Sequence, residues 1–543
     1  MAANVLDAEM LRKMFLSGAY NLDKNKVEIN DLNVFPVPDG DTGTNMSLTI
    51  LSAADAVKNV TEMTPEKVAK AISTGSLCGA RGNSGVILSQ IFRGFYKGIK
   101  GNDVLTVDVL TQGVVRAVET AYKAVMKPKE GTILTVAKAM ADKAVELNSP
   151  SIEVGPFFEG ILAASEETLN KTPDMLPVLK EAGVVDAGGM GLVTILKGAV
   201  AAYYGHEIED TAAAEPVPEV VYRYKTEFTV LTDQYFTEDN RLSLNNVLES
   251  IGNQVTLRVG EKSVDVFMKT DDPGIAIQEG IKYGQLMNVV VWNEGDMSTY
   301  PGYHDNRSPK TADVKLEETV PAELKEYAFI AVCAGDGLVD IFRKLGCDGI
   351  IEGGQTMNPS TDDIMKAIEK VHAETVYILP NNKNIILAAN QAARLTKTCR
   401  CEVIPTKTIP QGITAVASYV PERSVEENVK AMTEESQNVQ TGQITYSVRD
   451  TVIDGLTIKN GDLMGIADGR IACVGQNMMS VSLNLLNEMV TEDSELISLY
   501  AGAELNPVVM EEIRALVEEK YPDCDVEVNI GGQPVYYLIL SVE

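Results

Sequence analysis

The sequence predicts a multidomain protein of the α and α/β classes, in which an all-α N-terminal domain precedes a small α+β domain and a C-terminal α/β domain. Three observations support this. Apolar residues recur at helical spacing through residues 1–206, β-like runs first appear in residues 221–304, and strands alternate with helices in residues 319–543. The chain of 543 residues is also too long for a single domain with one hydrophobic core, because domains contain about 150 residues on average.

The bulk composition excludes several classes of function. The net charge of −30 argues against nucleic acid or an anionic membrane as the main partner, because phosphate neutralisation needs Lys and Arg. No run of about 18 apolar residues occurs, so we expect no membrane span. The first residues lack the apolar core of a secretory signal, and the seven scattered cysteines form no disulfide framework, so we expect a reducing cytoplasm.

Residues 1–206 predict a bundle of helices. The segment from Pro65 to Ile99 has apolar residues at helical spacing and is interrupted by Gly79, Gly82 and Gly85. Alternating apolar and polar runs are scarce in this part of the chain. The pattern therefore favours an all-helical domain over a sheet.

The composition changes over residues 207–220, which read EIEDTAAAEPVPEV and are typical of a linker. Beyond them, strands are predicted by the runs TEFTVLT, QVTLRVG, SVDVFMKT and LMNVVVWN. Two helical stretches lie between these runs and give the order βαββαβ. Residues 221–304 are therefore expected to form a ferredoxin-like α+β domain.

Residues 319–543 alternate strands with helices. The strand-like runs AFIAVCA, GIIEGG and TVYILP are separated by helical stretches such as LVDIFRKLG, and Ser360 is expected to be a helix N-cap. This alternation predicts a parallel α/β arrangement.

The segment most informative about chemistry reads LNVFPVPDGDTGTNM. Asp39 and Asp41 are separated by one glycine, so both carboxylates can converge on one hard cation, and Mg²⁺ pairs one or two carboxylates with substrate phosphates. The residues that follow lead into a helix, whose first N–H groups bind phosphate oxygens well. The same residues could form an Asx-rich turn that caps the helix, and residue types alone leave both interpretations open.

Two further glycine-rich loops favour a ligand site. They read GARGNSG (79–85) and VDAGGMG (185–191), and each lies between helical stretches. A simple helix–helix turn rarely needs three glycines in seven residues. Three such loops in one helical domain predict that several inter-helix loops meet around a ligand.

These loops, together with the run EGTILT (130–135), resemble the nucleotide-binding subunit of dihydroxyacetone kinases, the DhaL-type helical domain. The resemblance is closer to one branch of that family, the catalytic subunits of bacterial fatty-acid kinases (FakA). It extends over nearly the whole chain through the runs GARGNSGVILSQ, GVVDAGGMGL, GGQTMNPST, LPNNKNI, PTKTIPQG and GGQPVYYLILSVE.

The resemblance implies an antiparallel helical barrel that binds ATP and two Mg²⁺ ions at one rim, and a C-terminal region of the DegV type. It implies that Asp39 and Asp41 are the catalytic metal ligands. Asn33 stands where dihydroxyacetone kinases carry a further metal-binding Asp. The nucleotide contacts that it implies are Thr42, Gly43, Thr44, Asn45, Gly82, Asn83, Ser84, Thr132, Ile133, Asp186, Ala187 and Gly188.

For function, the resemblance implies a phosphotransferase. Its acceptor would be the carboxylate of a fatty acid presented by a separate DegV-type lipid-binding protein (FakB-like), and its product would be an acyl phosphate. A homodimer is expected for this family, and no nucleic-acid partner.

The middle domain departs from the family pattern. Many relatives carry a Cys in a Tyr-Cys-Thr-Glu-Phe run and two His in a His-Val-His-Thr run, which can hold a metal. In this chain those three positions are Lys225, Phe267 and Lys269. Charged ammonium groups cannot coordinate a metal, so we expect no zinc in this domain.

Two alternative functions remain open from the sequence. One is a kinase for dihydroxyacetone or another small polyol; kinases of this type bind the ketone through a His of a separate domain, and the three histidines His206, His304 and His372 are poorly placed for that role. The other is a regulatory scaffold that binds nucleotide without transfer, although such a protein need not keep both Asp39 and Asp41.

Overall fold

The structure is a computed structural model that describes residues 5–33, 40–125, 127–208, 224–232, 236–259, 263–293, 324–354, 357–447, 451–453 and 456–543. The chain forms two compact units, one of Met1–Thr211 together with Pro321–Glu543 and the other of Ala212–Val320. The first unit therefore contains both the N-terminal helices and the C-terminal sheets, and the second unit is inserted between them in sequence. None of the described helices has the length and apolar character needed to cross a membrane.

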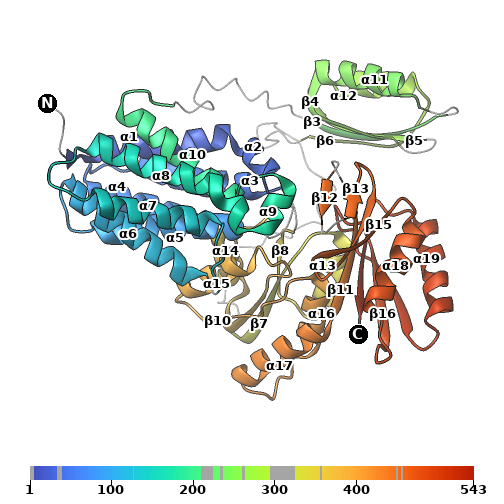
Figure 1. Cartoon of the computed structure of the whole chain (residues 1–543). Helices are drawn as coiled ribbons and strands as arrows, with labels where there is room; N and C mark the ends of the chain where they lie inside the picture. The colour runs from blue at the N-terminus through green and yellow to red at the C-terminus, as the bar shows by residue number, and fades with distance from the viewer. Residues whose placement is uncertain are drawn as a thin grey trace, which may run out of the picture. The chain divides into compact units, whose positions relative to one another are not determined.

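The N-terminal part of the first unit is a ring of helices, drawn in blue to green in Figure 1. Each helix of the ring packs against the next, and the last packs against the first. In ring order they are α1 (Ala8–Lys24), α3 (Thr42–Lys58), α4 (Pro65–Cys78), α5 (Gly82–Ile99), α6 (Val107–Ala124), α7 (Ile133–Leu147), α8 (Val154–Met175) and α10 (Ala187–Tyr203). We call this ring the barrel. It also contains two short helices, α2 (Lys26–Asp31) and α9 (Pro177–Ala182), and a pair of two-residue strands, β1 (Val5–Leu6) and β2 (Leu105–Thr106).

The break predicted between Pro65 and Ile99 is present and has a local cause. Helix α4 begins at Pro65, where the missing N–H costs nothing, and Thr64 caps it by accepting a hydrogen bond from the Lys67 amide. It ends at Cys78 with Gly79 as its C-cap, and α5 begins at Gly82. The prediction of an all-helical pattern here is confirmed.

Neighbouring helices of the ring run antiparallel, while alternate helices run parallel. Gly94 packs on Ala117 whereas Gly98 packs on Gly113, so α5 and α6 run in opposite directions. Gly82 packs on Asn45, however, so α3 and α5 begin side by side. Contacts of Gly191 with Met46 and of Gly188 with Ile133 place the starts of α3, α10 and α7 together in the same way. We call the end at which α3, α5, α7 and α10 begin the barrel rim.

The second unit has the predicted ferredoxin-like order. Its elements are β3 (Tyr224–Leu231), α11 (Glu238–Ile251), β4 (Gly252–Val259), β5 (Ser263–Thr270), α12 (Pro273–Ile281) and β6 (Gln285–Asn293). The antiparallel sheet has the strand order β4-β5-β3-β6. Both helices cover the face that carries Val264, Val266 and Met268 of β5, whose side chains form the core with Leu244 and Ala276.

The C-terminal part of the first unit contains a parallel sheet of four strands in the order β10-β9-β7-β8. Along β7, Ala328, Ile330 and Val332 enter one hydrophobic core, and Phe329 and Ala331 enter another, so both faces of the sheet are covered. Strands and helices alternate as β7 (Lys325–Cys333), α13 (Asp336–Lys344), β8 (Gly349–Glu352), α14 (Thr361–Val371), β9 (Ala373–Leu379), α15 (Ile386–Leu395), β10 (Arg400–Val403), α16 (Ile409–Ala417) and α17 (Val425–Asn438).

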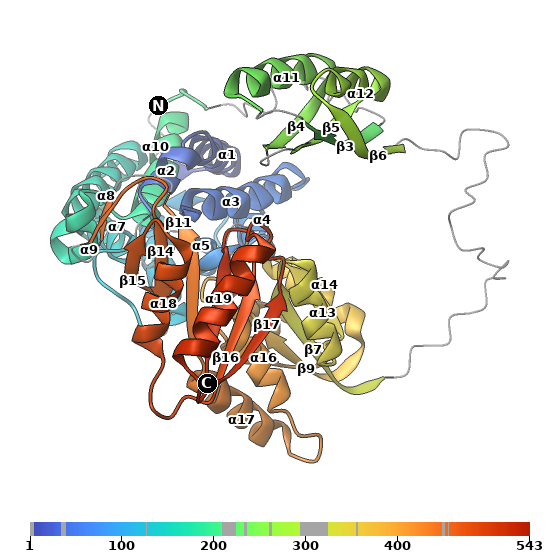
Figure 2. The ribbon, with the colours of Figure 1, turned by 90° about the vertical axis from the view of Figure 1, so that its right-hand side faces the viewer.

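A second, mixed sheet of six strands completes the C-terminal part, in the order β15-β14-β11-β18-β16-β17. Helices α18 (Met478–Met489) and α19 (Pro507–Lys520) lie side by side on one face of it (Figure 2). The strands are β11 (Gln440–Tyr446), β14 (Leu463–Ala467), β15 (Arg470–Gly475), β16 (Leu496–Ala501), β17 (Asp525–Ile530) and β18 (Leu538–Val542). Separately, β12 (Thr451–Ile453) pairs antiparallel with β13 (Leu456–Ile458). The predicted α/β class of this region is confirmed.

Candidate functional site at the barrel rim

The nucleotide contacts predicted from the sequence lie at the starts of the four helices that begin at the barrel rim. Each of the three predicted loops, and the EGTILT segment, leads into a different one of these helices. Thr42, Gly43, Thr44 and Asn45 open α3; Gly82, Asn83 and Ser84 open α5; Thr132 and Ile133 open α7; and Asp186, Ala187 and Gly188 open α10. Asp39 lies outside the described residues.

The starts of α3 and α5 are held together by side chains. Asn30 of α2 caps the start of α3. Its Oδ1 accepts from the Thr44 backbone amide at 3.0 Å, and its Nδ2 donates to the Thr44 Oγ1 at 2.9 Å. Gly82 has a φ of +58°, and a Cβ there would lie 2.6 Å from the Nδ2 of Asn45. Only glycine fits this approach, so the backbone of α5 meets the Asn45 side chain of α3 directly.

Asp186 joins the starts of α7 and α10. Its carboxylate accepts from the Gly189 amide of α10 at 2.7 Å and from the Ile133 amide of α7. Its own amide donates to the Oγ1 of Thr172 at 3.1 Å. Burial raises the pKa of Asp186 to about 6, against 3.8 ordinarily. This carboxylate therefore holds the starts of α7 and α10 together within the protein.

The charge pattern of the barrel distinguishes its two ends. Apart from the N-caps Asp41 and Asp186, the first turns of α3, α5, α7 and α10 carry no acidic residue. At the opposite end, α1, α4 and α6 each carry an acid in the first turn, and Glu153 is the N-cap of α8. The N-caps of α5 and α7 also provide no side-chain hydrogen bond. Helix N-termini attract anions, so the barrel rim suits a phosphate.

The C-terminal part of the chain contributes residues that sequence reasoning did not assign to the site. The Nδ2 of Asn358 donates to the Oδ2 of Asp41 at 2.6 Å, and the Nδ2 of Asn83 donates to the Oδ1 of Asn384 at 3.0 Å. Arg81 forms an ion pair with Asp363 at 3.3 Å. Asn358 and Asn384 lie in the runs GGQTMNPST and LPNNKNI, which contributed to the family resemblance but gave no indication of contact with the barrel.

The residues present fit the cation of a nucleotide in their chemistry. Asp41 supplies a hard carboxylate oxygen next to the helix starts, which is the combination that Mg²⁺ shares with phosphate. Asn33 is buried and close to Asp41 in sequence. Its backbone N–H donates to the backbone carbonyl of Asn30 at 3.0 Å. Over the described ranges, no three His, Cys, Asp or Glu side chains cluster as a metal site of their own.

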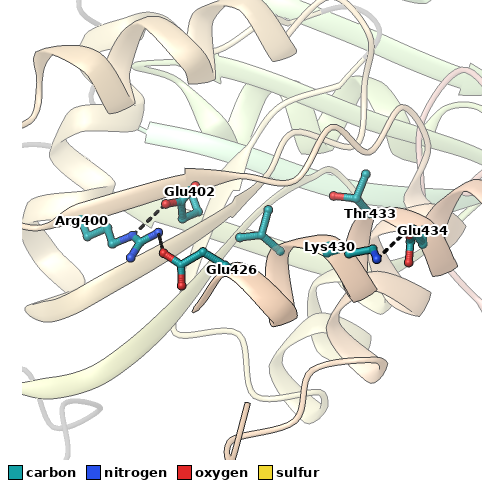
Figure 3. Close-up of a pocket in the computed structure, with 7 residues that line it drawn as sticks. Arg400, Glu402, Glu426, Lys430, Thr433 and Glu434 are labelled. Carbon is teal, nitrogen blue, oxygen red and sulfur yellow. Dashed lines mark hydrogen bonds and ion pairs between the residues drawn. The ribbon is translucent and has the colours of Figure 1, made fainter. Parts of the chain in front are cut away.

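A hollow between β10 and α17 is a weaker candidate for a ligand site. Its volume is about 380 Å³, and its charged side chains point toward one another (Figure 3). Arg400 pairs with Glu402 at 2.8 Å and with Glu426 at 2.9 Å, and Lys430 pairs with Glu434 at 3.8 Å. Because these charges already have partners, the hollow offers little to a charged ligand.

Comparison with known proteins matches the chain to three family models. Residues 328–543 match the C-terminal domain of FakA-like fatty acid kinase proteins, residues 221–295 match the middle domain of the same proteins, and residues 36–201 match the DAK2 domain. Protein YloV of Bacillus subtilis (strain 168) is 39% identical over 100% of both chains. An uncharacterized protein of Staphylococcus aureus (strain USA300) is 39% identical over 99% of both chains.

Two similar solved structures each cover 40% of the chain. A DegV family protein from Ruminococcus gnavus is 13% identical with a TM-score of 0.31, and 99% of that protein is covered. The dihydroxyacetone kinase of C. freundii is 14% identical with a TM-score of 0.30, and 49% of that protein is covered.

Proposed function

Because the chain belongs to the family of FakA-like fatty acid kinase proteins, we propose that it is the ATP-dependent catalytic component of a fatty-acid kinase. The DAK2 match over residues 36–201 supports a kinase-like chemistry for the barrel. The acceptor in this proposal is the carboxylate of a fatty acid, and the product is an acyl phosphate.

The observation that carries the proposal is the charge pattern of the barrel. In a chain of net charge −30, four helices begin at one rim with no acid in their first turns, and the carboxylate of Asp41 stands at the start of α3. This combination suits a triphosphate and its cation, because the phosphates are attracted to helix N-termini and the cation to carboxylates.

In the proposed reaction, a carboxylate oxygen of the fatty acid attacks the γ-phosphorus of ATP. The bond between that phosphorus and the β–γ bridging oxygen breaks, ADP leaves, and the acyl phosphate forms without a covalent enzyme intermediate. Asp39 and Asp41 would hold Mg²⁺, which neutralises phosphate charge when bound. The first-turn N–H groups of α3 and α5, with the side chains of Asn83 and Ser84, would hold the phosphates in line with the acceptor.

A separate protein that carries the fatty acid is part of the proposal. The name of the family denotes one component of a fatty acid kinase, which supports an enzyme of more than one component. We propose a DegV-type fatty-acid-binding protein as the second component, a homodimeric state for the present chain, and ATP with two Mg²⁺ ions as its cofactors.

The proposal is tested with the purified chain, ATP, Mg²⁺, oleate and a DegV-type fatty-acid-binding protein, with acyl phosphate trapped by hydroxylamine. We expect partner-dependent acyl hydroxamate that disappears in Asp41→Ala. The matched control is Asp55→Ala, an exposed acid toward the other end of α3 that pairs with Lys58 at 3.7 Å; it should retain activity. Phosphorylation of dihydroxyacetone without the partner, or ATP binding with no transfer, would contradict the proposal.

A further inference from the structure

Asn358 brings a side chain of the C-terminal domain to the carboxylate of Asp41. It lies between β8 and α14, and it is 3% exposed. Its Nδ2 donates to the Oδ2 of Asp41 at 2.6 Å and lies 3.4 Å from the Oδ1 of Asn45. Both acceptors belong to the first turn of α3 or its N-cap, so the amide is directed at the start of that helix.

The barrel also holds the backbone on which Asn358 stands. Arg81, the N-cap of α5, donates from its Nη1 to the carbonyl oxygen of Asn358 at 2.8 Å. The Thr361 amide, three residues on, donates to the Ala80 carbonyl at 3.1 Å. Ser360 forms a capping box at the start of α14, which confirms the predicted N-cap and fixes the end of the loop. The position of Asn358 therefore follows from several contacts besides the one it makes with Asp41.

The chemistry of the amide suits a residue that orients a metal ligand. A carboxylate has lone pairs on both oxygens, so Asp41 can accept from Asn358 and bind a cation at the same time. Carboxylates that bind metals are ordinarily held by hydrogen bonds of this kind. The Oδ1 of Asn358 is buried and has no hydrogen-bond partner among the residues that the structure describes. A cation or its hydration water would satisfy a buried acceptor of this kind.

We propose that Asn358 is a positioning residue of the metal site, and that the C-terminal domain thereby completes a site that the barrel begins. Its amide holds the Asp41 carboxylate in the orientation that binds the cation of the nucleotide. This inference rests on the proposed function, since the cation is taken to be the one that accompanies ATP.

The test measures cation binding to the full chain by Mn²⁺ paramagnetic resonance in the presence of ADP, without fatty acid or partner. Asn358→Leu removes the donor at similar volume, and Asn358→Ala removes it while leaving room for water. We expect both to weaken Mn²⁺ binding about 10–100-fold, as is typical when a hydrogen-bond partner of a metal ligand is lost. When Asn358→Leu is added to Asp41→Asn, Mn²⁺ binding should weaken little further, because both residues act on the same metal ligand.

The matched control is Gln391→Leu. Gln391 belongs to α15 and also contacts the barrel, but it does so through Gln90 and the Leu77 carbonyl rather than at the start of α3. The Gln391→Leu variant should retain parental Mn²⁺ affinity. Circular dichroism and the thermal midpoint show whether each variant is folded.

The outcomes separate the two proposals. If Asn358→Leu and Asn358→Ala bind Mn²⁺ like the parent while Asp41→Asn does not, the positioning role is wrong and the proposed function stands. If Gln391→Leu weakens Mn²⁺ binding as much as Asn358→Leu, the effect is one of domain docking and the positioning role is again wrong. If the parent binds no Mn²⁺ with ADP, the proposed function itself fails.

Discussion

Gln90 of the barrel and Gln391 of the C-terminal domain are joined by a buried hydrogen bond of 2.7 Å, from the Nε2 of Gln90 to the Oε1 of Gln391. The Nε2 of Gln391 also donates to the Leu77 carbonyl at 2.8 Å and lies 3.2 Å from the Oγ1 of Thr361. Around this pair, Ala80 and Val86 of the barrel lie in the same hydrophobic core as strands and helices of the parallel sheet. The two regions therefore share buried apolar and polar contacts.

We expect Gln391→Leu to lower the free energy of unfolding by about 1–3 kcal/mol. The substitution leaves Gln90 and the Leu77 carbonyl buried without their partner, and unpaired buried polar groups carry a cost of this size. Urea unfolding followed by circular dichroism measures the change. The control is Gln112→Leu. The side-chain amide of Gln112 donates to Asp108 at an exposed position, so this substitution should change the free energy of unfolding by less than about 0.5 kcal/mol. Equal effects of the two substitutions would contradict a buried link.

Asp186 should make stability depend on pH. Its folded pKa of about 6 is above its ordinary value of 3.8, so the folded chain binds more protons than the unfolded chain between these values. The contribution of this group to stability is therefore greatest below pH 3.8 and falls as pH rises to about 6, by about 3 kcal/mol. Asp186→Asn can still cap α10 but does not titrate.

The measurement for Asp186 is the difference in unfolding free energy between Asp186→Asn and the parent at several pH values. This difference should rise in favour of the variant between pH 4 and pH 7, the range that brackets the raised pKa of about 6. Taking the difference cancels the titration of other carboxylates, which both proteins share. A constant difference across this range would show that Asp186 does not have a raised pKa in the folded chain.

Gly82→Ala should lower stability more than an alanine substitution at another glycine of positive φ. Both the φ of +58° and the 2.6 Å approach of a Cβ to the Nδ2 of Asn45 oppose a side chain at residue 82. Gly101 has a φ of +83° and nothing within 4 Å of a Cβ, so Gly101→Ala reports the backbone strain alone, about 1–2 kcal/mol. Thermal unfolding should show a larger loss for Gly82→Ala, and only that variant should weaken ATP binding. Equal losses in both would refute a role for the close approach.

The middle domain should contain no stoichiometric zinc. Lys225 and Lys269 are opposite each other in the pairing of β3 with β5, and Phe267 lies on the same face two residues from Lys269. The resemblance described above implies Cys and His at these three positions, and Lys225 instead forms an ion pair with Glu227 at 3.0 Å. Elemental analysis of protein purified in metal-free buffer checks this expectation. The variant carrying Lys225→Cys, Phe267→His and Lys269→His is the positive control and should gain zinc; stoichiometric zinc in the parent would contradict the prediction.

Much of the fold could be predicted from local patterns. Helical spacing and the capping of α4 by Thr64 and Pro65 are properties of a few neighbouring residues, as is the capping box at Ser360, so they can be recognised in one sequence. The βαββαβ order likewise follows from short alternating runs. Glycine-rich loops mark the starts of three rim helices, α3, α5 and α10.

Contacts between distant segments could not be predicted in this way. Asn358 and Asp41 are 317 residues apart, and a single polar contact leaves no periodic signal in either segment. The carboxylate of Asp186 accepts from two helix starts whose proximity depends on closure of the whole ring, and its contact with a nucleotide stays a prediction. The role of Asp39 stays a prediction, because that residue lies outside the described ranges.

The shared core between the barrel and the parallel sheet has a consequence for biosynthesis. Gln90 leaves the ribosome 301 residues before Gln391, an interval of about 15–60 s at about 5–20 residues per second. During that time Ala80 and Val86 have no sheet to pack against, and the inserted second unit is made in between. Part of the apolar surface of the nascent barrel thus stays uncovered until a segment far along the chain has been translated.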